Sequence, residues 1–549
     1  MNRAKFRSIC SILAIMGLFP LLFYFAFFCI LTYPAITQFR THFFSDQGDG
    51  LQCAWNLWWV RKAVVDLHQS PWRSNYLHWP YGISLLGHTL HPFNGFATMF
   101  LPLSIPLVER YNLVVIFSFV VGGLTAFLLA HHVTNSYWGS VIAGFLFTFS
   151  SFHFAHLEGH LQMVSLEWIP LFILLWFKLV SKPTVPLSIC AALVLFLIIL
   201  CDFYFFFYCV LTGLIIFCWR LDRKKEGVPF FRAYLIPLGV FGLISVATSG
   251  MLAGSFLLAN SRDAFLGAHP EWEFSLDLFA PFIYGGHWRF ATLTKPYWSQ
   301  LPGSIHESSV HLGLAVVILL VYVWRKRKLE QMPGIGLWFF LLFFFAVLAL
   351  GPSLQILGEQ KDWLSMPYAW LQALFPPLRT SGVPVRMIII TVLAASVISA
   401  EGFKLLFRGS YRNRVFAAVL LGLALLDHLP RPITTSAPSI PPYVSVLREL
   451  PGKDGVLDTV SSPTLALYYQ TVHEKPLAFG YVSRVPTSVN AKDRELAKAI
   501  KANDFLSLWR VYDIKYLITS HEPVGLRNSH GLIWCDGSVW MFDLGACRR

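Results

Sequence analysis

The chain has 549 residues, of which 55% are hydrophobic and only 13% are charged, and its mean hydropathy is +0.56. These values exclude an ordinary soluble globular protein and indicate a polytopic α-helical membrane protein. The formal charge of +13 is explained by basic cytoplasmic loops between membrane spans, so we expect no nucleic-acid partner.

Apolar runs long enough to cross a bilayer recur between residues 8 and 430. A helix of about 17 to 25 residues covers a hydrocarbon core of roughly 30 Å. The first run lacks a small-residue cleavage site, so we expect a retained span and not a signal sequence. The run 186–219 is too long for one span and carries Asp202, which predicts two spans that meet at a "CDFY" turn. The runs predict about eleven spans, at residues 8–33, 111–131, 137–151, 163–181, 186–201, 203–219, 233–257, 310–324, 335–351, 383–404 and 414–430.

Clusters of Lys and Arg at the span ends predict the orientation of the chain, because cytoplasmic loops carry the basic excess. Such clusters stand at 2–7, 220–227, 325–328 and 404–414. An even number of crossings separates each pair if the segment 91–108, with its three prolines, dips into the membrane without crossing it. The N-terminus is then cytoplasmic, and the first long loop 34–110 and the tail from residue 431 are extracytoplasmic.

The first loop contains "SDQGDG" at 45–50, directly before "LQCAWNLWW". The spacing of Asp49 and Gln52 predicts a capping box, with Asp49 as the N-cap of a helix that runs to about residue 67. Three tryptophans on one side of that helix predict that it lies in the headgroup zone. Asp46 is not needed for the cap, and the glycines beside Asp49 would let a bulky substrate approach the backbone. Asp49 is therefore either a helix cap or a site of chemistry.

A second polar segment, "FHFAHLEGHLQMVSLEW", covers residues 152–168. If it is one helix, one face carries His153, His156, His160 and Glu167, and Glu158 lies on another face. Such a group can bind a divalent metal, bind phosphate, or form hydrogen bonds in a water-filled vestibule.

Two arginines in "PPLRTSGVPVRM", Arg379 and Arg386, stand on the predicted extracytoplasmic side, where arginine is disfavoured. A guanidinium in the membrane costs roughly 2.5 to 3.5 kcal/mol at mid-depth, so an anion such as a lipid phosphate is its natural partner. Snorkelling to the headgroups is the alternative. Asp202 and His91 face the same side, and Asp202 needs a partner or water inside its apolar hairpin.

The tail begins with the proline-rich linker "PRPITTSAPSIPP" and then becomes mixed and charged. Helical patterns in "YVSVLREL" and at 491–512, with strand patterns in "GVLDTV", "KYLITS" and "SVWMFDL", predict a small α/β domain at 431–549. Cys535 and Cys547 could form a disulfide if this domain lies in an oxidising compartment.

Several segments, taken in chain order, resemble the YfhO-like bacterial branch of the GT-C superfamily, the integral-membrane glycosyltransferases that use polyprenyl-phosphate sugars. These segments are "GDGLQCAWNLWW", "HTLHPFNG", "YNLVVIFSFVVGGLTAFLLA", "FAHLEGHLQMVSLEWIPL", "DFYFFFY", "LRTSGVPVRM", "YYQTVHEKPLAFGYVSR" and "VYDIKYLI". The resemblance implies a GT-C-like transmembrane domain at 1–430 in the bacterial cytoplasmic (inner) membrane.

The resemblance also implies an essential acidic residue in the first loop, which matches Asp49 best and Asp46 second. Many GT-C enzymes carry a second acidic motif after a later span, but here no Asp-x-Asp stands there, only His156, Glu158 and His160. The sequence therefore admits a divalent metal without requiring one.

We therefore expect a membrane glycosyltransferase that moves a sugar from a polyprenyl-phosphate donor to an extracytoplasmic hydroxyl of a glycan, a lipid or a protein. Asp49 is the expected general base, and Asp46 would orient the acceptor or a metal. The donor phosphate is expected to bind Arg386, Arg379, His160 and His156, with support from Glu158, Asp202 and His91, and its isoprenoid chain to lie beside 91–108. The alternatives are a lipid or glycolipid transporter or flippase, and a noncatalytic envelope-assembly protein.

Overall fold

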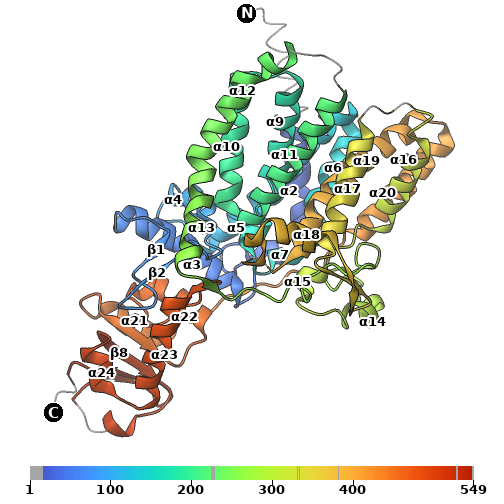
Figure 1. Ribbon diagram of the computed structural model, residues 1–549. Coiled ribbons are helices and arrows are strands. Elements are labelled where there is room, and N and C mark those ends of the chain that lie inside the picture. Colours follow the sequence, from blue (N-terminus) through green and yellow to red (C-terminus); the bar gives the residue numbers. More distant parts are fainter. Residues whose placement is uncertain are drawn as a thin grey trace, which may run out of the picture. The chain divides into compact units, whose positions relative to one another are not determined.

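The computed structural model describes residues 17–223, 229–330, 332, 334–380, 382–526 and 530–546. The chain is mainly helical and divides into two compact units, each built from separate segments (Figure 1). Unit 1 comprises Met1–Gln38, Asn112–Ala253 and Ala268–Thr434, and unit 2 comprises Phe39–Tyr111, Gly254–Gly267 and Thr435–Arg549. The predicted domain boundary after residue 430 stays a prediction.

Among the described residues, six helical segments are long and apolar enough to cross a membrane, as in a membrane-protein fold. They are Leu107–Thr134 (α5), Tyr137–Leu157 (α6 and α7), Leu161–Ser181 (α8 and α9), Phe203–Leu221 (within α11), Ala233–Arg262 (α12, η4 and α13) and Pro384–Arg408 (η7 and α19). Three shorter apolar helices are α2 (Phe19–Leu31), α10 (Val185–Cys201) and α17 (Ile335–Ala349).

Each predicted span coincides with a helix wherever the structure describes it. The predicted spans 310–324 and 414–430 coincide with α16 (Leu314–Lys326) and α20 (Tyr411–Asp427). The first predicted span extends before residue 17, outside the described residues. The predicted division of the long run 186–219 is confirmed, because α10 ends at Cys201 and α11 (Phe203–Arg223) begins directly after an extended Asp202. The count of eleven crossings stays a prediction.

Helix α19 (Ile388–Arg408) is largely buried and packs against α6 (Tyr137–Thr148), α16, α17 and α20. Small residues allow the closest of these approaches. A Cβ added to Gly139 of α6 would lie 2.5 Å from the carbonyl oxygen of Ala400. Close packing through small residues is typical of membrane helices, where backbones must approach one another.

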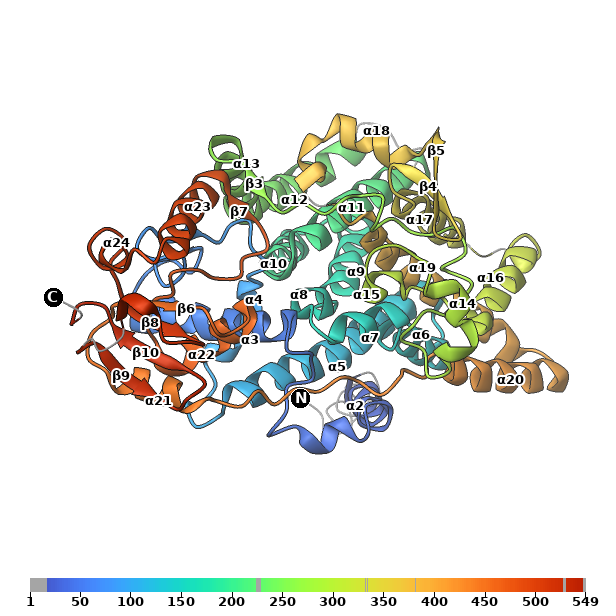
Figure 2. The ribbon, with the colours of Figure 1, turned by 90° about the horizontal axis from the view of Figure 1, so that it is seen from below.

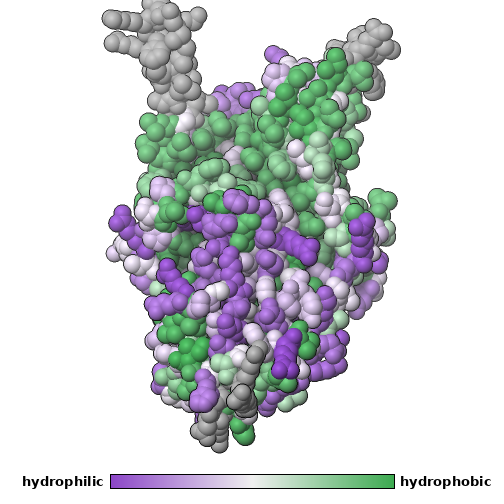
Figure 3. All heavy atoms as spheres, turned by 90° about the vertical axis from the view of Figure 1, so that its left-hand side faces the viewer, coloured by the Kyte–Doolittle hydropathy of each residue, from purple (hydrophilic) through white to green (hydrophobic). Residues whose placement is uncertain are grey.

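From residue 233 onward, α12 (Pro229–Ser245) and η4 (Val246–Gly250) expose large apolar side chains, among them Leu235, Ile236, Leu243 and Val246. Figure 3 shows apolar side chains gathered over the helical surface on this side of the molecule. A surface of this kind is typical of helices that face lipid.

Short elements complete unit 1. The hairpin β4 (Ser353–Ile356) and β5 (Glu359–Ser365) is antiparallel. The remaining helices are η2 (Ala35–Gln38), α7 (Ser151–Leu157), α8 (Leu161–Val164), α9 (Trp168–Ser181), α13 (Met251–Arg262), η5 (Ala291–Thr294), α14 (Lys295–Trp298), α15 (Ile305–Ser308), α18 (Pro367–Leu374), η6 (Pro376–Thr380) and η7 (Pro384–Met387). Helix α15 lies beside α7 (Figure 2), and both carry residues of the candidate site.

Unit 2 contains a four-stranded sheet in the order β6-β8-β10-β9. Strand β6 (Gly455–Asp458) is parallel to β8 (Ile514–Thr519), and β10 (Trp540–Asp543) is antiparallel to both β8 and β9 (Leu532–Cys535). The tail contributes α21 (Pro442–Glu449), α22 (Pro463–His473), β7 (Val485–Pro486), α23 (Thr487–Lys501), α24 (Phe505–Arg510) and η8 (Val524–Leu526). Cys547, the predicted partner of Cys535, lies outside the described residues.

The first loop belongs to the same unit. It forms α3 (Asp49–Arg61), η3 (Lys62–Asp66), β1 (Arg73–Ser74), β2 (Ile83–Ser84) and α4 (Pro92–Met99), and β3 (Phe265–Leu266) pairs with β7. The segment 91–108 thus contains one short helix and the start of α5.

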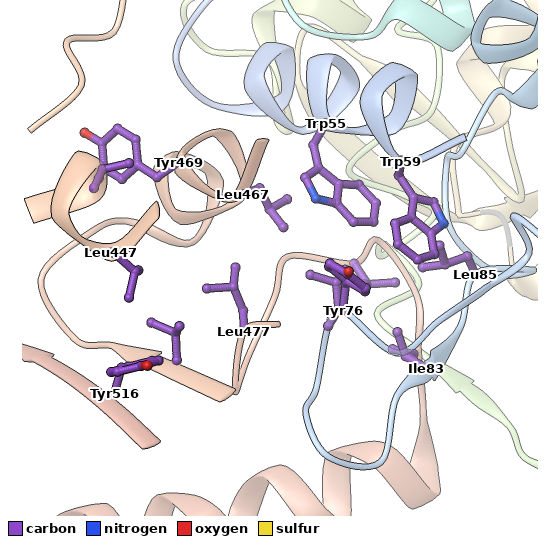
Figure 4. Close-up of a cluster of buried hydrophobic side chains, with 14 of the residues drawn as sticks. Trp55, Trp59, Tyr76, Ile83, Leu85, Leu447, Leu467, Tyr469, Leu477 and Tyr516 are labelled. Carbon is purple, nitrogen blue, oxygen red and sulfur yellow. The ribbon is translucent and has the colours of Figure 1, made fainter. Parts of the chain in front are cut away.

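Trp55 and Trp59 of α3 lie in the hydrophobic core of unit 2 and not at a lipid surface. Their rings stack with centroids 5.5 Å apart, and both side chains are fully buried. Figure 4 shows them facing side chains of the tail, including Leu467 and Leu477. The Trp55 indole N–H also donates to Oε1 of Gln470 at 2.7 Å. The prediction that these tryptophans lie in the headgroup zone is therefore wrong. A protein core can bury an indole ring and accept a hydrogen bond from its N–H as well as a membrane interface can.

Candidate functional site

Unit 1 holds a buried group of titratable side chains at the break between α7 and α8. The shared helical face considered for 152–168 does not form, because α7 ends at Leu157, α8 begins at Leu161, and His160 has a non-helical backbone. Gly159 within the break has low helix propensity. The break separates the residues that a single helix would place on one face. His153 contacts the carbonyl oxygens of Thr148 and Val164, at 2.7 and 2.8 Å, and does not belong to the groups described next.

The first triad consists of His156, His160 and Glu307, whose ligand atoms lie within 4.8 Å of one another. Nε2 of His156 is 3.2 Å from Oε2 of Glu307, and the Arg386 guanidinium donates from Nε to Oε1 of Glu307 at 2.9 Å. Burial alone would raise the pKa of Glu307, but Arg386 and His156 hold this pKa well below its usual range. Glu307 is therefore ionised. It is the anion in contact with Arg386, for which a lipid phosphate was the expected partner.

The second triad consists of Glu158, His287 and His306, again with ligand atoms within 4.8 Å of one another. Arg431 donates to both carboxylate oxygens of Glu158, from Nη2 to Oε2 at 2.5 Å and from Nε to Oε1 at 3.3 Å. Nε2 of His287 lies 3.4 Å from Oε2 of Glu158. Burial opposes ionisation of Glu158, but His287 and Arg431 outweigh it and lower its pKa to about 2. Burial lowers the pKa of His287 to about 4.

The other predicted residues of unit 1 have different surroundings. Asp202 caps α11, because its Oδ1 accepts from the backbone N–H groups of Tyr204 and Phe205 at 2.7 and 3.2 Å. Burial raises the pKa of Asp202 to about 7, and the charge of Arg386 opposes that rise. Arg379 is exposed on η6.

In unit 2, the two aspartates of the loop 45–50 form different hydrogen bonds. Oδ1 of Asp46 accepts from the backbone N–H groups of Gly48 and Gly50, each at 3.1 Å. Gly48 is the N-cap of α3, and a glycine has no side chain that could cap the helix. The predicted capping box, with Asp49 as the N-cap, is therefore wrong. Gly50 is required sterically, since a Cβ there would lie 2.3 Å from Oγ of Ser45. Asp46 thus organises the backbone at the start of the helix.

Asp49 stands in the first turn of α3, is partly exposed, and forms a side-chain hydrogen bond with Tyr481. Burial and the Asp49 charge raise the pKa of the Tyr481 hydroxyl, so this hydroxyl is protonated and donates to the carboxylate. Asp49 is also near enough to His88 to affect its pKa, which burial lowers to about 3. The Tyr481 hydroxyl is therefore one partner of this carboxylate.

His91 lies in the same unit at the N-cap of α4, with a φ of 40°. It is 2% exposed, and neither of its ring nitrogens has a hydrogen-bond partner among the described residues. Burial lowers its pKa to about 3, so the ring is neutral.

Residues 21–427 match the family described as Domain of unknown function (DUF6311), which is well over half of the chain. The chain belongs to the DUF6311 family. No curated protein matches it.

Solved structures similar to this DUF6311 chain include AglB, an archaeal oligosaccharyltransferase from Archaeoglobus fulgidus, in complex with an inhibitory peptide and a dolichol-phosphate. The identity is 11% over 87% of this chain and 66% of that chain, with a TM-score of 0.43. The apo oligosaccharyltransferase of Archaeoglobus fulgidus matches at 10% identity over 98% of this chain and 72% of that chain, with a TM-score of 0.47. ArnT from Cupriavidus metallidurans, bound to undecaprenyl phosphate, matches at 9% identity over 95% of this chain and 97% of that chain, with a TM-score of 0.46. This chain thus spans about two thirds of the length of the AglB structure, and at TM-scores below 0.5 these likenesses establish neither its activity nor its substrate.

The DUF6311 match includes both predicted aspartates and all six members of the two triads, whereas Arg431 and Tyr481 lie beyond it. Sequence reasoning missed Glu307, His287, His306, Arg431 and Tyr481. One local signal existed: His306 and Glu307 are adjacent in the polar segment between the predicted spans 233–257 and 310–324.

Proposed function

We propose that this chain is a membrane glycosyltransferase that uses a polyprenyl-phosphate-linked sugar, with Asp49 as the general base. The supporting observation is that the two aspartates of the loop 45–50 have different hydrogen-bond partners. Asp46 accepts from the backbone N–H groups of Gly48 and Gly50 at the start of α3, whereas the Asp49 carboxylate accepts from the Tyr481 hydroxyl. It is partly exposed and bonded to Tyr481, as a base that must meet a substrate hydroxyl requires.

The reaction is a displacement at the anomeric carbon. Asp49 removes the proton from the acceptor hydroxyl as its oxygen attacks that carbon, the bond from the carbon to the donor phosphate oxygen breaks, and the polyprenyl phosphate leaves with the electron pair. Attack from the face opposite the leaving group inverts the anomeric centre. The Tyr481 hydroxyl orients the carboxylate by donating to it, and Asp46 is a positioning residue in this scheme.

The proposed ligands of the donor phosphate are Arg379, Arg386, His156 and His160. Glu307 already offsets the charge of Arg386, so a phosphate near this pair requires further positive charge. The first triad offers two imidazoles and a carboxylate, a donor set that fits a divalent ion such as Zn²⁺, which would supply that charge.

A radiolabelling experiment tests this function. The full-length protein in proteoliposomes is given polyprenyl-phosphate-linked ¹⁴C-hexoses together with envelope glycan and lipid extracts as acceptors. We expect label to move to an acceptor, and Asp49→Asn to reduce the rate by about 10²- to 10⁴-fold, the usual contribution of a general base.

Asp46→Asn, which keeps an acceptor oxygen for the backbone, is expected to retain most activity. Asp513→Asn is the matched control, because Asp513 is an exposed residue of the same unit with a φ of 52°, a conformation that Asn also adopts. Unchanged donor that crosses the bilayer would support a flippase, and neither transfer nor movement would support an assembly protein. Full activity of Asp49→Asn would exclude Asp49 as the base.

A further inference from the structure

The second triad has the composition and support of a metal site. Glu158 lies at the break between α7 and α8, His287 in the segment before η5, and His306 on α15, so three separate segments of unit 1 present one ligand atom each. The side chains of Glu158 and His287 are 4% and 2% exposed. Imidazole nitrogens with one carboxylate oxygen are a donor set that suits Zn²⁺.

Hydrogen bonding around Ser309 assigns the proton of His287. The Ser309 hydroxyl can donate its only hydrogen to the carbonyl oxygen of Ile305 at 2.8 Å. Nδ1 of His287 lies 2.9 Å from the same Ser309 oxygen, so in this assignment Nδ1–H is the donor of that bond. In the neutral ring, Nε2 therefore presents a lone pair.

That lone pair meets a second acceptor. Nε2 of His287 lies 3.4 Å from Oε2 of Glu158, and this carboxylate is held by the guanidinium of Arg431. Two buried acceptors at this distance repel each other unless a positively charged atom lies between them. A proton or a metal ion would meet that need.

The position of His306 indicates that a metal ion, and not a proton, lies between these acceptors. A proton is shared by two atoms, whereas this site brings a third donor within 4.8 Å of the other two. Nδ1 of His306 lies 3.0 Å from the carbonyl oxygen of Ala155, which can only accept, so this nitrogen also carries its proton. Metal-binding histidines characteristically donate their second ring N–H to a carbonyl or a similar acceptor, which fixes the ring for coordination.

We propose that Glu158, His287 and His306 bind a divalent transition-metal ion, with Zn²⁺ as the best fit, and leave its fourth position open. Arg431 and the backbone N–H of Thr434 hold the carboxylate, Ser309 holds His287, and the Ala155 carbonyl holds His306. Since Arg431 already offsets the charge of Glu158, the bound ion leaves an excess of positive charge. An anionic fourth ligand, a hydroxide or a phosphate oxygen, would reduce that excess.

This site does not depend on the proposed glycosyl transfer, because its test measures bound metal. The full-length protein is purified in detergent, stripped with a chelator, and titrated with Co²⁺ or Zn²⁺. Co²⁺ is followed by its visible absorption, and Zn²⁺ by elemental analysis. We expect His306→Gln and His287→Gln each to remove one ion per chain. Ser309→Ala should weaken the binding by about 10- to 100-fold, the usual effect of losing a residue that orients a metal ligand.

Two variants serve as controls. His160→Gln removes a ligand of the first triad only, so the ion assigned to the second triad should remain. His311→Gln alters another buried histidine of unit 1, which bonds to Gly285 and Asp427, and should change neither the stoichiometry nor the affinity. Size-exclusion profiles and thermal unfolding of each variant report whether it is folded.

The wild-type protein provides a measurement that requires no variant. Carbethoxylation of His306, mapped by mass spectrometry, should be suppressed by Zn²⁺ and restored by the chelator. Metal binding that is unchanged in folded His306→Gln and His287→Gln, or carbethoxylation of His306 that Zn²⁺ does not affect, would overturn the proposal.

Discussion

Glu307 in unit 1 and Asp49 in unit 2 are carboxylates held in different ways. Glu307 is buried and divides its oxygens between Arg386 and His156, so its charge is offset by a cation in direct contact. Asp49 is partly exposed, and the hydroxyl of Tyr481 donates to it. A buried carboxylate paired with arginine is a weak base that holds its surroundings together, whereas a partly exposed carboxylate can reach the hydroxyl of a substrate.

Removal of the cation beside Glu307 should have the largest effect on stability. Arg386→Gln leaves a buried carboxylate without its counter-charge and is expected to lower the free energy of unfolding by about 3 to 5 kcal/mol. The double variant Arg386→Met/Glu307→Leu, which removes both charges, should lose much less. Thermal unfolding in detergent measures both, and equal losses in the single and double variants would show that the pair is not a structural unit.

The Tyr481 hydroxyl should influence catalysis more than stability. A hydrogen bond to a charged group contributes about 1.5 to 3 kcal/mol. Tyr481→Phe is therefore expected to lower kcat by about 10- to 100-fold, because the Asp49 carboxylate loses the donor that orients it. Initial rates with labelled donor measure this change.

Tyr516→Phe is the matched control for Tyr481→Phe, since Tyr516 is in the same unit and its hydroxyl donates to the carbonyl oxygen of Pro451 at 3.3 Å. It should leave kcat unchanged. Equal losses from the two variants would contradict a specific contact between Tyr481 and Asp49.

The smallest effect is expected at Asp46. Asp46→Ala removes the acceptor for Gly48 and Gly50 and should lower the free energy of unfolding of unit 2 by about 0.5 to 2 kcal/mol, the usual range for the loss of a helix cap. Asp46→Asn keeps an acceptor oxygen and should stay near the wild-type value. Hydrogen exchange at the start of α3 measures the difference, and a stable Asp46→Ala would refute the capping role.

Local sequence predicted the helices well and the site in part. The spans follow from the length of the apolar runs, and the division of the run 186–219 follows from Asp202 in its middle. The shared helical face considered for 152–168 does not form, because apolar and polar periodicity continues across Gly159 although the backbone breaks there. The spacing of Asp49 and Gln52 favoured Asp49 as the cap, whereas in the structure the Asp46 carboxylate accepts from the N–H groups of Gly48 and Gly50.

The sequence by itself determined that this is a helical membrane protein and where its apolar helices lie, because a backbone in lipid must satisfy its own hydrogen bonds over a fixed thickness. Only the tertiary structure decided the partners of the polar side chains. Arg386 meets Glu307 across 79 positions of sequence, and Trp55 meets Gln470 across 415. Such contacts leave no local period in the sequence, since they arise when separate segments pack together.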